Sequence, residues 1–582
     1  MYTSGWLLSC LSLTLLSSAS ALTSQDYCPP LGPDYPPPSS LSNDRIFTAA
    51  IQEVLSSLDQ VTGSNGDLHN DSISVQIFSG RDPKPLAYFA ATSEHINTTL
   101  GVSSVDENTV FRVGSVSKIF TVTLLLMEEG LWAFSEPIAK YVPELREAAE
   151  RLRWDPRRRR DAVDYVNWGS ITIGELASHL AGIPRDYGEL DLSGQAALME
   201  QLGFPALSPS EVPPCGNPDP YMGKSVFTAD DEIAEFFKGL IQRHPVVATS
   251  STPVYSNAAF QILAYALEAM TGESFERLLH EDIVVPLGLE ATSYFKPDMS
   301  VGVIPTEDGE HWWSFDLGDE GPAGGIYSST RDMTALGQAI LNGSLLPASI
   351  TRRWMKPHSH TSTLDSSVGA PWEIITLENG RPIDIYSKAG DIGAYSSMIA
   401  LSPDYDVGFT IFFAGTDGHA KVALAADLIS AKLFPGLEAA AKDQAASRFG
   451  GDYASAEGVN STISITTDDG PGLQIASWVN NGTDMIQSLM TMSNAQDPST
   501  FSVRLYPTGL DSPGQIAFRA VLPARLSTAG NGPFTSECLT WVTMDAQIYG
   551  GIGIDEFVFN FNEAGSVTSI TPRVLRATLP KI

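Results

Sequence analysis

The chain has 582 residues, 43% of them hydrophobic and 18% charged, which is enough for two or three domains with sizeable cores. It carries 35 Lys and Arg against 68 Asp and Glu, a formal net charge of −33 at pH 7. Nucleic acids and anionic membrane surfaces repel this charge, so both are disfavoured as partners. The composition favours a soluble, acidic protein with an enzymatic role.

The first 21 residues contain no Asp, Glu, Lys or Arg. Trp6 to Leu16 is mostly apolar, and Ala19-Ser20-Ala21 fits a small-x-small cleavage site. Residues 1–21 are therefore predicted to be a signal peptide, which makes the mature protein secreted and extracellular. The alternatives are a buried N-terminal helix or a membrane anchor, since the first residues lack Lys and Arg.

Further signals agree with export. Five N-x-S/T sequons are predicted as glycosylation sites, at Asn70, Asn97, Asn342, Asn460 and Asn481. Beyond Cys10 in the signal peptide, the cysteines are Cys28, Cys215 and Cys538. Three cysteines allow one disulfide in three possible pairings, and the sequence does not choose among them.

The next 400 residues indicate a layered domain. Residues 22–44 form a proline-rich, extended lead-in. A helix is expected over 44–58 and strands over 72–78 and 86–91, followed by a long, mainly helical middle. Strands return near 384–415, so both ends of the segment build one sheet. This order is typical of an α/β or α+β fold.

Near residue 440 the pattern changes. Ala439 to Arg448 is an alanine-rich helical stretch. Short alternating runs then follow, at Thr462–Thr466, Leu473–Trp478, Ser502–Tyr506, Gln515–Val521, Glu556–Phe561 and Ser569–Leu575. We therefore expect one domain over 45–437 and a smaller all-β domain over 438–582.

A basic segment, residues 151–161, stands out in this acidic chain and contains Arg157-Arg158-Arg159-Arg160. It is read as a solvated loop whose arginines pair with nearby acids. The alternative is a site cut by a processing protease of the secretory pathway, because nicking concentrates at exposed loops.

The motif S-x-x-K occurs twice, at Ser115–Lys118 and at Ser293–Lys296. Pro297 follows the second copy, and no helical pattern begins there. Ser115 instead opens an apolar run, Ile119 to Met127, that is long enough for a buried helix. The first copy is therefore the candidate for chemistry.

At the start of a helix, residues i and i+3 share a face, so the Lys118 amine can reach the Ser115 hydroxyl. A buried amine resists protonation and can then accept the serine proton. The plainer alternative is that Ser115 is a helix N-cap and that Lys118 extends to solvent.

Two more clusters accompany this motif. Tyr255 and Asn257 lie on a loop before a helical run, Ala258 to Met270. Lys388 and Gly390 precede a predicted hairpin of Ser397–Leu401 and Val407–Phe413. Lys388 is therefore expected at a strand edge, where Gly390 lets a ligand approach the backbone.

Other motifs are missing or weak. The sequence contains no G-x-S-x-G, no G-x-x-x-x-G-K-[ST] and no H-E-x-x-H. His358 and His360 make an incomplete ligand set in a polar loop, so no metal site is expected there. His179 is expected to be a buried structural histidine.

The order S-x-x-K, Y-x-N, K-x-G resembles the serine β-lactamase and penicillin-binding-protein superfamily, and Tyr255 points to its class C β-lactamase, D,D-peptidase and esterase branch. Supporting stretches are Phe111–Lys118, Ile171–Arg185, Pro286–Leu289 and Gly321–Ser329. The resemblance covers roughly residues 45–435. With the downstream β domain, the chain is similar to the secreted β-lactamase-like proteins of filamentous fungi.

This resemblance implies an antiparallel sheet flanked by helices, with a helical subdomain, ahead of the all-β domain. It implies that Ser115 forms an acyl-enzyme while Lys118 and Tyr255 transfer the proton, and it leaves open which of the two is the base. Asn257, Lys388 and Gly390 would bind the substrate. The oxyanion hole would be the backbone N–H groups of Ser115 and Asp391.

The third motif departs from the family pattern. It reads Lys388-Ala389-Gly390, so the hydroxyl that often holds a β-lactam carboxylate is missing. Asp391 follows directly, and its charge is expected to repel an anionic substrate. Both features argue against β-lactamase activity.

The resulting hypothesis is a secreted serine hydrolase or acyltransferase acting on an ester, amide or lactone of a small molecule, with a possible place in secondary metabolism. It needs no cofactor and no metal, and its partner is the small-molecule acyl substrate. The alternative is a catalytically silent binding or cell-surface protein.

Overall fold

The computed structural model describes residues 27–189, 191–215, 229–379, 381–455, 460–495, 498, 501–522 and 538–582. These residues form two compact units, one of Pro36–Gln444 and one that joins the chain up to Tyr35 to Ala445–Ile582. The predicted signal peptide, residues 1–21, lies outside the described residues, so it stays a prediction.

The larger unit is built on one antiparallel sheet with strand order β2-β1-β10-β9-β8-β7-β6-β5. Strands from both ends of the segment pair at its centre, where β1 lies beside β10 with Ser72 opposite Ala414. The strands are β1 Ser72–Ser79, β2 Ala87–Ala91, β5 Ser359–His360, β6 Ser366–Val368, β7 Glu373–Glu378, β8 Pro382–Ile392, β9 Tyr395–Ser402 and β10 Val407–Ala414.

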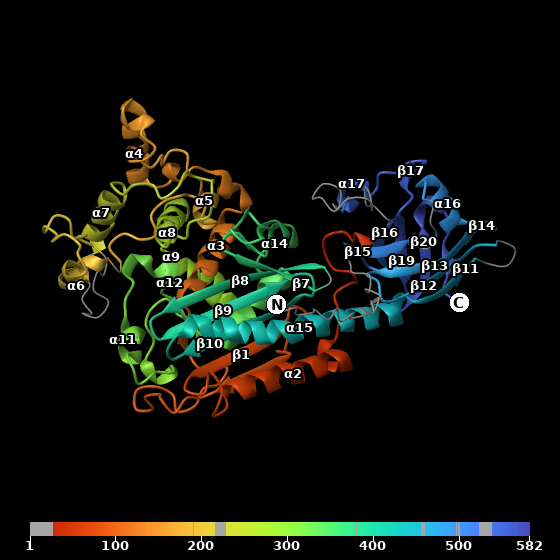
Figure 1. Ribbon diagram of the computed structural model, residues 1–582, viewed down its shortest axis with the longest axis horizontal. Coiled ribbons are helices and arrows are strands. Elements are labelled where there is room, and N and C mark those ends of the chain that lie inside the picture. The colour runs from red at the N-terminus through yellow and green to blue at the C-terminus, as the bar shows by residue number, and fades with distance from the viewer. Residues whose placement is uncertain are drawn as a thin grey trace, which may run out of the picture. The chain divides into compact units, whose positions relative to one another are not determined.

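Helices cover both faces of this sheet (Figure 1). They are α2 Arg45–Thr62, α3 Ser117–Glu128, α4 Pro143–Trp154, α5 Ile173–Ala177, α6 Ala196–Gln201, α7 Ala229–Leu240, α8 Ala258–Thr271, α9 Phe275–Leu278, α10 Val285–Leu287, α11 Gly309–Ser314, α12 Gly321–Gly324, α13 Thr330–Asn342, α14 Ala348–Trp354 and α15 Gly418–Phe449.

The alternation of β1 explains the two layers. Ile73, Val75 and Ile77 pack with α2 and α15 in one apolar cluster. Ser74 faces the other way, and its hydroxyl lies 2.9 Å from Thr330 of α13. On that second side α3 and α8 form the larger apolar cluster, so the S-x-x-K helix is buried between the sheet and other helices.

The smaller unit contains a nine-stranded antiparallel sheet with main order β11-β12-β13-β15-β16-β19-β20-β21, and β14 pairs with β13. The strands are β11 Gly451–Ala454, β12 Thr462–Thr466, β13 Leu473–Asn480, β14 Thr483–Asp484, β15 Arg504–Ser512, β16 Gln515–Val521, β19 Glu556–Phe561, β20 Val567–Pro572 and β21 Leu579–Pro580. Short pieces α16 Met485–Met492, α17 Thr540–Thr543, β17 Ile548–Tyr549 and β18 Ile552–Gly553 lie beside it.

A disulfide joins Cys28 to Cys538 within this smaller unit, with the Cα atoms 5.2 Å apart. Of the three possible pairings, the structure therefore has this one, and Cys215 is buried in the larger unit. The hydroxyl of Thr540 also donates to the Cys28 carbonyl, so the start of the described chain is tied to α17.

The helical stretch predicted from Ala439 to Arg448 is confirmed, and it forms the end of α15, which begins at Gly418 and contains Pro435. One strand prediction needs correction. The strand expected over Ser569–Leu575 ends at Pro572, because proline has no N–H with which to continue the ladder, and Arg573–Leu575 forms a 3₁₀ turn.

The basic segment lies on the surface of the protein. Arg158–Arg160 forms an exposed 3₁₀ turn in which the Arg158 Nε lies 3.4 Å from the Asp155 carboxylate. This contact agrees with a solvated loop, and proteolytic processing there stays a prediction. No helix within the described ranges has both the length and the apolar character that crossing a bilayer requires.

Candidate active site

Ser115 lies in a 3₁₀ turn, Gly114–Val116, that leads directly into α3. Gly114 has φ +51°, a left-handed conformation that glycine adopts without strain. The Ser117 hydroxyl donates to the Gly114 carbonyl at 2.7 Å and accepts from the Ile326 N–H at 3.1 Å. These bonds hold the turn, so Ser115 stands at the start of α3 and is partly exposed.

The Lys118 amine lies one helical turn along and is fully buried. Its Nζ is 3.1 Å from the Ser115 Oγ, and it also donates to the Asn257 Oδ1 and the Ala323 carbonyl, both at 2.7 Å. The last two groups only accept hydrogen bonds. A neutral amine has two hydrogens for them, and its lone pair then faces the Ser115 hydroxyl.

Tyr255 completes the contacts of the nucleophile. It lies on the loop before α8, and its hydroxyl donates to the Ser115 Oγ at 2.7 Å. The Lys118 Nζ lies 4.8 Å from the centre of its ring. The structure thus brings Ser115 and Lys118 at the start of α3 together with Tyr255 on the loop before α8, although Tyr255 and Ser115 are 140 residues apart in the chain.

The electrostatics of the site favour proton transfer from Ser115. Burial lowers the pKa of Lys118 below its ordinary value. Burial raises the pKa of Tyr255, but the charge that Lys118 carries when it holds the proton and the charge of Lys388 together outweigh burial, so the net shift is downward. Both groups are therefore closer to a proton-accepting state than they are in water.

His179 is buried, as expected, but it has a partner in the site. Its ring stacks on Tyr255 with centroids 4.4 Å apart, and its Nδ1 accepts from the Ser256 N–H at 3.2 Å. Burial, with Lys118 and Lys388 nearby, holds the pKa of His179 well below its usual range. A neutral imidazole therefore supports the Tyr255 ring.

Lys388 lies on β8 with a side chain that is only 1% exposed. Its Nζ contacts the Glu373 carboxylate on β7 and lies 5.2 Å from the centre of the Tyr255 ring. The second Glu373 oxygen accepts from the Ala389 N–H at 2.9 Å. Burial lowers the pKa of Lys388, but Glu373 outweighs it and raises the pKa. Lys388 thus stays charged beside Tyr255.

Gly390 lies against the Ser115 turn. A Cβ atom at this position would lie 2.1 Å from the Val113 carbonyl and 2.7 Å from the Ser115 N. The missing side chain therefore lets β8 approach this turn, and close approach of a ligand to the Gly390 backbone stays a prediction. On the opposing side, a Cβ at Gly114 would lie 2.6 Å from the Asp391 N. The two backbone amides predicted to form the oxyanion hole are thus close neighbours.

The Asp391 carboxylate is held by two partners. It accepts from the Ser396 hydroxyl at 2.7 Å, and its other oxygen is 2.8 Å from the His419 Nδ1 at the start of α15. Ala389 lies on the same side of β8, since side chains alternate along a strand. These contacts fix the position of the Asp391 carboxylate and leave its charge in place, so its repulsion of an anionic substrate stays a prediction.

Asn257 connects Lys118 to a group of acids. Its Oδ1 accepts from Lys118, and its Nδ2 donates to the Asp186 Oδ1 at 2.8 Å. Asp186 also bonds to the buried Glu320. Burial raises the pKa of Glu320 well above its ordinary value, and Asp186 and Glu189 add to the effect. Glu320 is therefore a neutral acid close to the site.

The second S-x-x-K copy, Ser293 and Lys296, does not form a contact like that of Ser115 with Lys118. The Ser293 hydroxyl donates to the Phe295 carbonyl at 2.6 Å, while the exposed Lys296 lies 3.4 Å from Ser314. His360 contacts Ser367. Among the described residues, no group of three or more His, Cys, Asp and Glu side chains is arranged to hold a metal ion.

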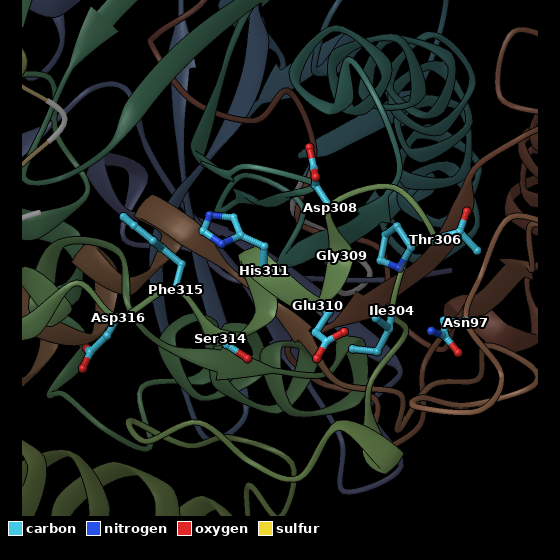
Figure 2. A pocket seen from close by; sticks show the side chains of 11 residues that line it. Asn97, Ile304, Thr306, Asp308, Gly309, Glu310, His311, Ser314, Phe315 and Asp316 are labelled. Carbon is cyan, nitrogen blue, oxygen red and sulfur yellow. The ribbon is translucent and has the colours of Figure 1, made fainter. Parts of the chain in front are cut away.

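The five sequon asparagines differ in exposure. Asn70, Asn342, Asn460 and Asn481 are exposed, whereas Asn97 is half-buried. Asn97 lines a pocket of about 590 Å³ beside α11, shown in Figure 2 with Asp308, Glu310 and Asp316. No residue of the three motifs lines this pocket. The candidate active site is therefore identified from the contacts among the motif residues and not from this pocket.

Sequence reasoning missed four neighbours of the site that have titratable side chains, Asp186, Glu320, Glu373 and His419. Glu373 is the clearest case, because only the pairing of β7 with β8 places it beside Lys388. Asp186 carried a weak signal, since it directly follows the stretch ending at Arg185 that supports the family resemblance.

Comparisons with known proteins place the chain in a family. The model of the family described as "Beta-lactamase" matches residues 86–433, and that described as "Beta-lactamase-like-like, C-terminal domain" matches residues 441–582. The chain belongs to the β-lactamase family, a family of serine hydrolases.

Relatives span almost the whole chain. A "Beta-lactamase-like protein" of Arthroderma benhamiae is 31% identical over 98% of this chain and 98% of its own length. A "Probable hydrolase M10" of Phoma sp. is 26% identical over 100% of this chain and 95% of its own. A class C β-lactamase from Rhodobacter sphaeroides is 20% identical, covers 66% of this chain and 99% of its own, and has a TM-score of 0.44.

The buried Glu320 gives a prediction about stability. Its raised pKa means that folding favours the protonated acid, so its contribution is present below the unfolded pKa and is lost as the pH rises through the folded value. Glu320→Gln keeps a donor for Asp186 without the charge. We expect its melting temperature, relative to wild type, to increase from pH 4 to pH 8.

Thermal melts of both proteins across this range measure the effect. Glu310→Gln, which removes an exposed carboxylate from α11, is the matched control. A Glu320→Gln variant that loses stability relative to wild type as the pH rises would contradict a neutral Glu320.

Proposed function

We propose that this protein is a secreted serine hydrolase that forms an acyl-enzyme on Ser115 and acts on an ester, amide or lactone of a small molecule. The observation that carries the proposal is the double contact of the Ser115 Oγ with the Lys118 Nζ and the Tyr255 hydroxyl. The relative with the name "Probable hydrolase M10" supports the hydrolase class.

The geometry supports the following steps. The Ser115 oxygen attacks the acyl carbonyl while its proton passes to Lys118 or Tyr255. The backbone N–H groups of Ser115 and Asp391 stabilise the oxyanion. Collapse of the tetrahedral intermediate breaks the bond to the leaving group, which takes up the proton. Water or another nucleophile then attacks the acyl-enzyme, loses a proton to the same base and restores Ser115.

Three parts of the proposal rest on sequence alone. Secretion follows from the predicted signal peptide and the sequons, and a place in secondary metabolism from the acyl-enzyme's ability to pass its acyl group to a nucleophile other than water. The excess of acidic residues disfavours nucleic acid and membranes as partners.

Ser115 is the proposed nucleophile. A fluorophosphonate probe should label the wild-type protein at Ser115, because an activated serine attacks phosphorus as it attacks a carbonyl. Ser115→Ala should abolish the label without unfolding the protein, whereas Ser293→Ala should keep it. Peptide mapping by mass spectrometry locates the label, and a label that persists in Ser115→Ala would show that another residue is the nucleophile.

The third motif, Lys388-Ala389-Gly390, bears on the choice of substrate. Lys388 is buried against Glu373, and Ala389 offers no hydroxyl, so a β-lactam carboxylate gains little at the edge of β8. We expect a higher kcat/KM for p-nitrophenyl butyrate than for nitrocefin. Ala389→Thr with Asp391→Ser should shift the ratio toward nitrocefin, and a clear preference of the wild type for nitrocefin would contradict this account of the third motif.

A further inference from the structure

Both lysines of the site are committed to contacts within the protein. Lys118 is 0% exposed and Lys388 is 1% exposed. The first donates to Asn257 and Ala323, and the second to Glu373 and the Ala389 carbonyl. A positive charge that meets the substrate from solvent must therefore come from another side chain.

Arg185 is such a side chain. Its side chain is 66% exposed, and its guanidinium carbon lies 5.1 Å from the centre of the Tyr255 ring. The hydroxyl of that ring donates to the Ser115 Oγ. One exposed positive charge is thus separated from the nucleophile by a single tyrosine ring.

The position of Arg185 is fixed by the site itself. Its carbonyl accepts from the N–H groups of Asn257 and Ala258 at 2.9 and 3.0 Å. Its Nε lies 3.3 Å from the Asp186 Oδ2, and the other Asp186 oxygen accepts from Asn257. Because Nε takes the contact to Asp186, the terminal nitrogens of the guanidinium retain donors for a carboxylate.

We propose that Arg185 binds a carboxylate on the acyl part of the substrate, so that the preferred acyl group is that of a dicarboxylic acid. This inference rests on the proposed function and adds to it a class of substrate. It differs from recognition of a β-lactam carboxylate, which belongs to the leaving-group side of the scissile bond. Arg185 comes from the segment after α5 and is bonded to the start of α8, whereas Lys388, Ala389 and Asp391 lie on β8.

Nearby carboxylates supply the competing hypothesis. Asp186 lies beside Arg185, and Glu320 interacts with both Asp186 and Glu189. If Asp186 rather than Arg185 met the substrate, the site would prefer an ammonium group. Asp186 already accepts from Asn257 and contacts Arg185, and its side chain is only 19% exposed, so the geometry favours Arg185.

Three p-nitrophenyl esters of equal chain length distinguish these cases: the neutral hexanoate, the hemiadipate with a terminal carboxylate, and the ω-aminohexanoate with a terminal ammonium. Wild-type protein should have its highest kcat/KM for the hemiadipate. In Arg185→Gln the ratio of hemiadipate to hexanoate should fall about five-fold, mainly through KM, as expected for one exposed ion pair.

Arg158→Gln, which removes an exposed arginine from the distant 3₁₀ turn, should keep the wild-type ratio. An unchanged ratio in Arg185→Gln, or a wild-type preference for the ω-aminohexanoate, would overturn the inference. Wild-type protein that hydrolyses none of the three esters and takes no label at Ser115 would refute the proposed function instead.

Discussion

The burial of the Lys118 amine against Ser115 is the constraint on which the rest of the site depends. Moving an ammonium group out of water costs several kcal/mol, so an amine in this place is retained only with well-placed acceptors. Asn257 and the Ala323 carbonyl supply them. The start of α8 and the α12 segment must therefore meet α3, and this meeting also sets Tyr255 against the Ser115 hydroxyl.

Lys388 and Glu373 extend the same logic to the sheet. Lys388 is held charged by Glu373 at the edge of β8, and its charge lowers the pKa of Tyr255. His179 stacks on the Tyr255 ring as a neutral imidazole and therefore adds no further positive charge beside the phenol. Helices and sheet thus both act on the pKa of one phenol, which explains why three motifs from separate stretches of the chain are needed for one reaction.

Local sequence patterns predicted most helices and strands, but they did not predict which distant residues pair across the sheet. Ser115 and Lys118 could be chosen over Ser293 and Lys296 because an apolar run follows the first pair and Pro297 follows the second. Glu373 could not be found in this way, since it reaches Lys388 only through the register of β7 and β8. Gly390 shows the same limit, because the sequence pointed to a ligand at its backbone and gave no sign that the Val113 and Ser115 backbone packs against it.

A double-mutant cycle on Lys118 and Tyr255 tests the central claim most directly, with kcat/KM for p-nitrophenyl butyrate as the measurement. Lys118→Ala and Tyr255→Phe should each lower it by about 10²–10⁴-fold. Because both side chains act on one proton of Ser115, the double variant should lose little more than the worse single variant. Near-wild-type activity in Tyr255→Phe, or losses that multiply in the double variant, would contradict a shared role.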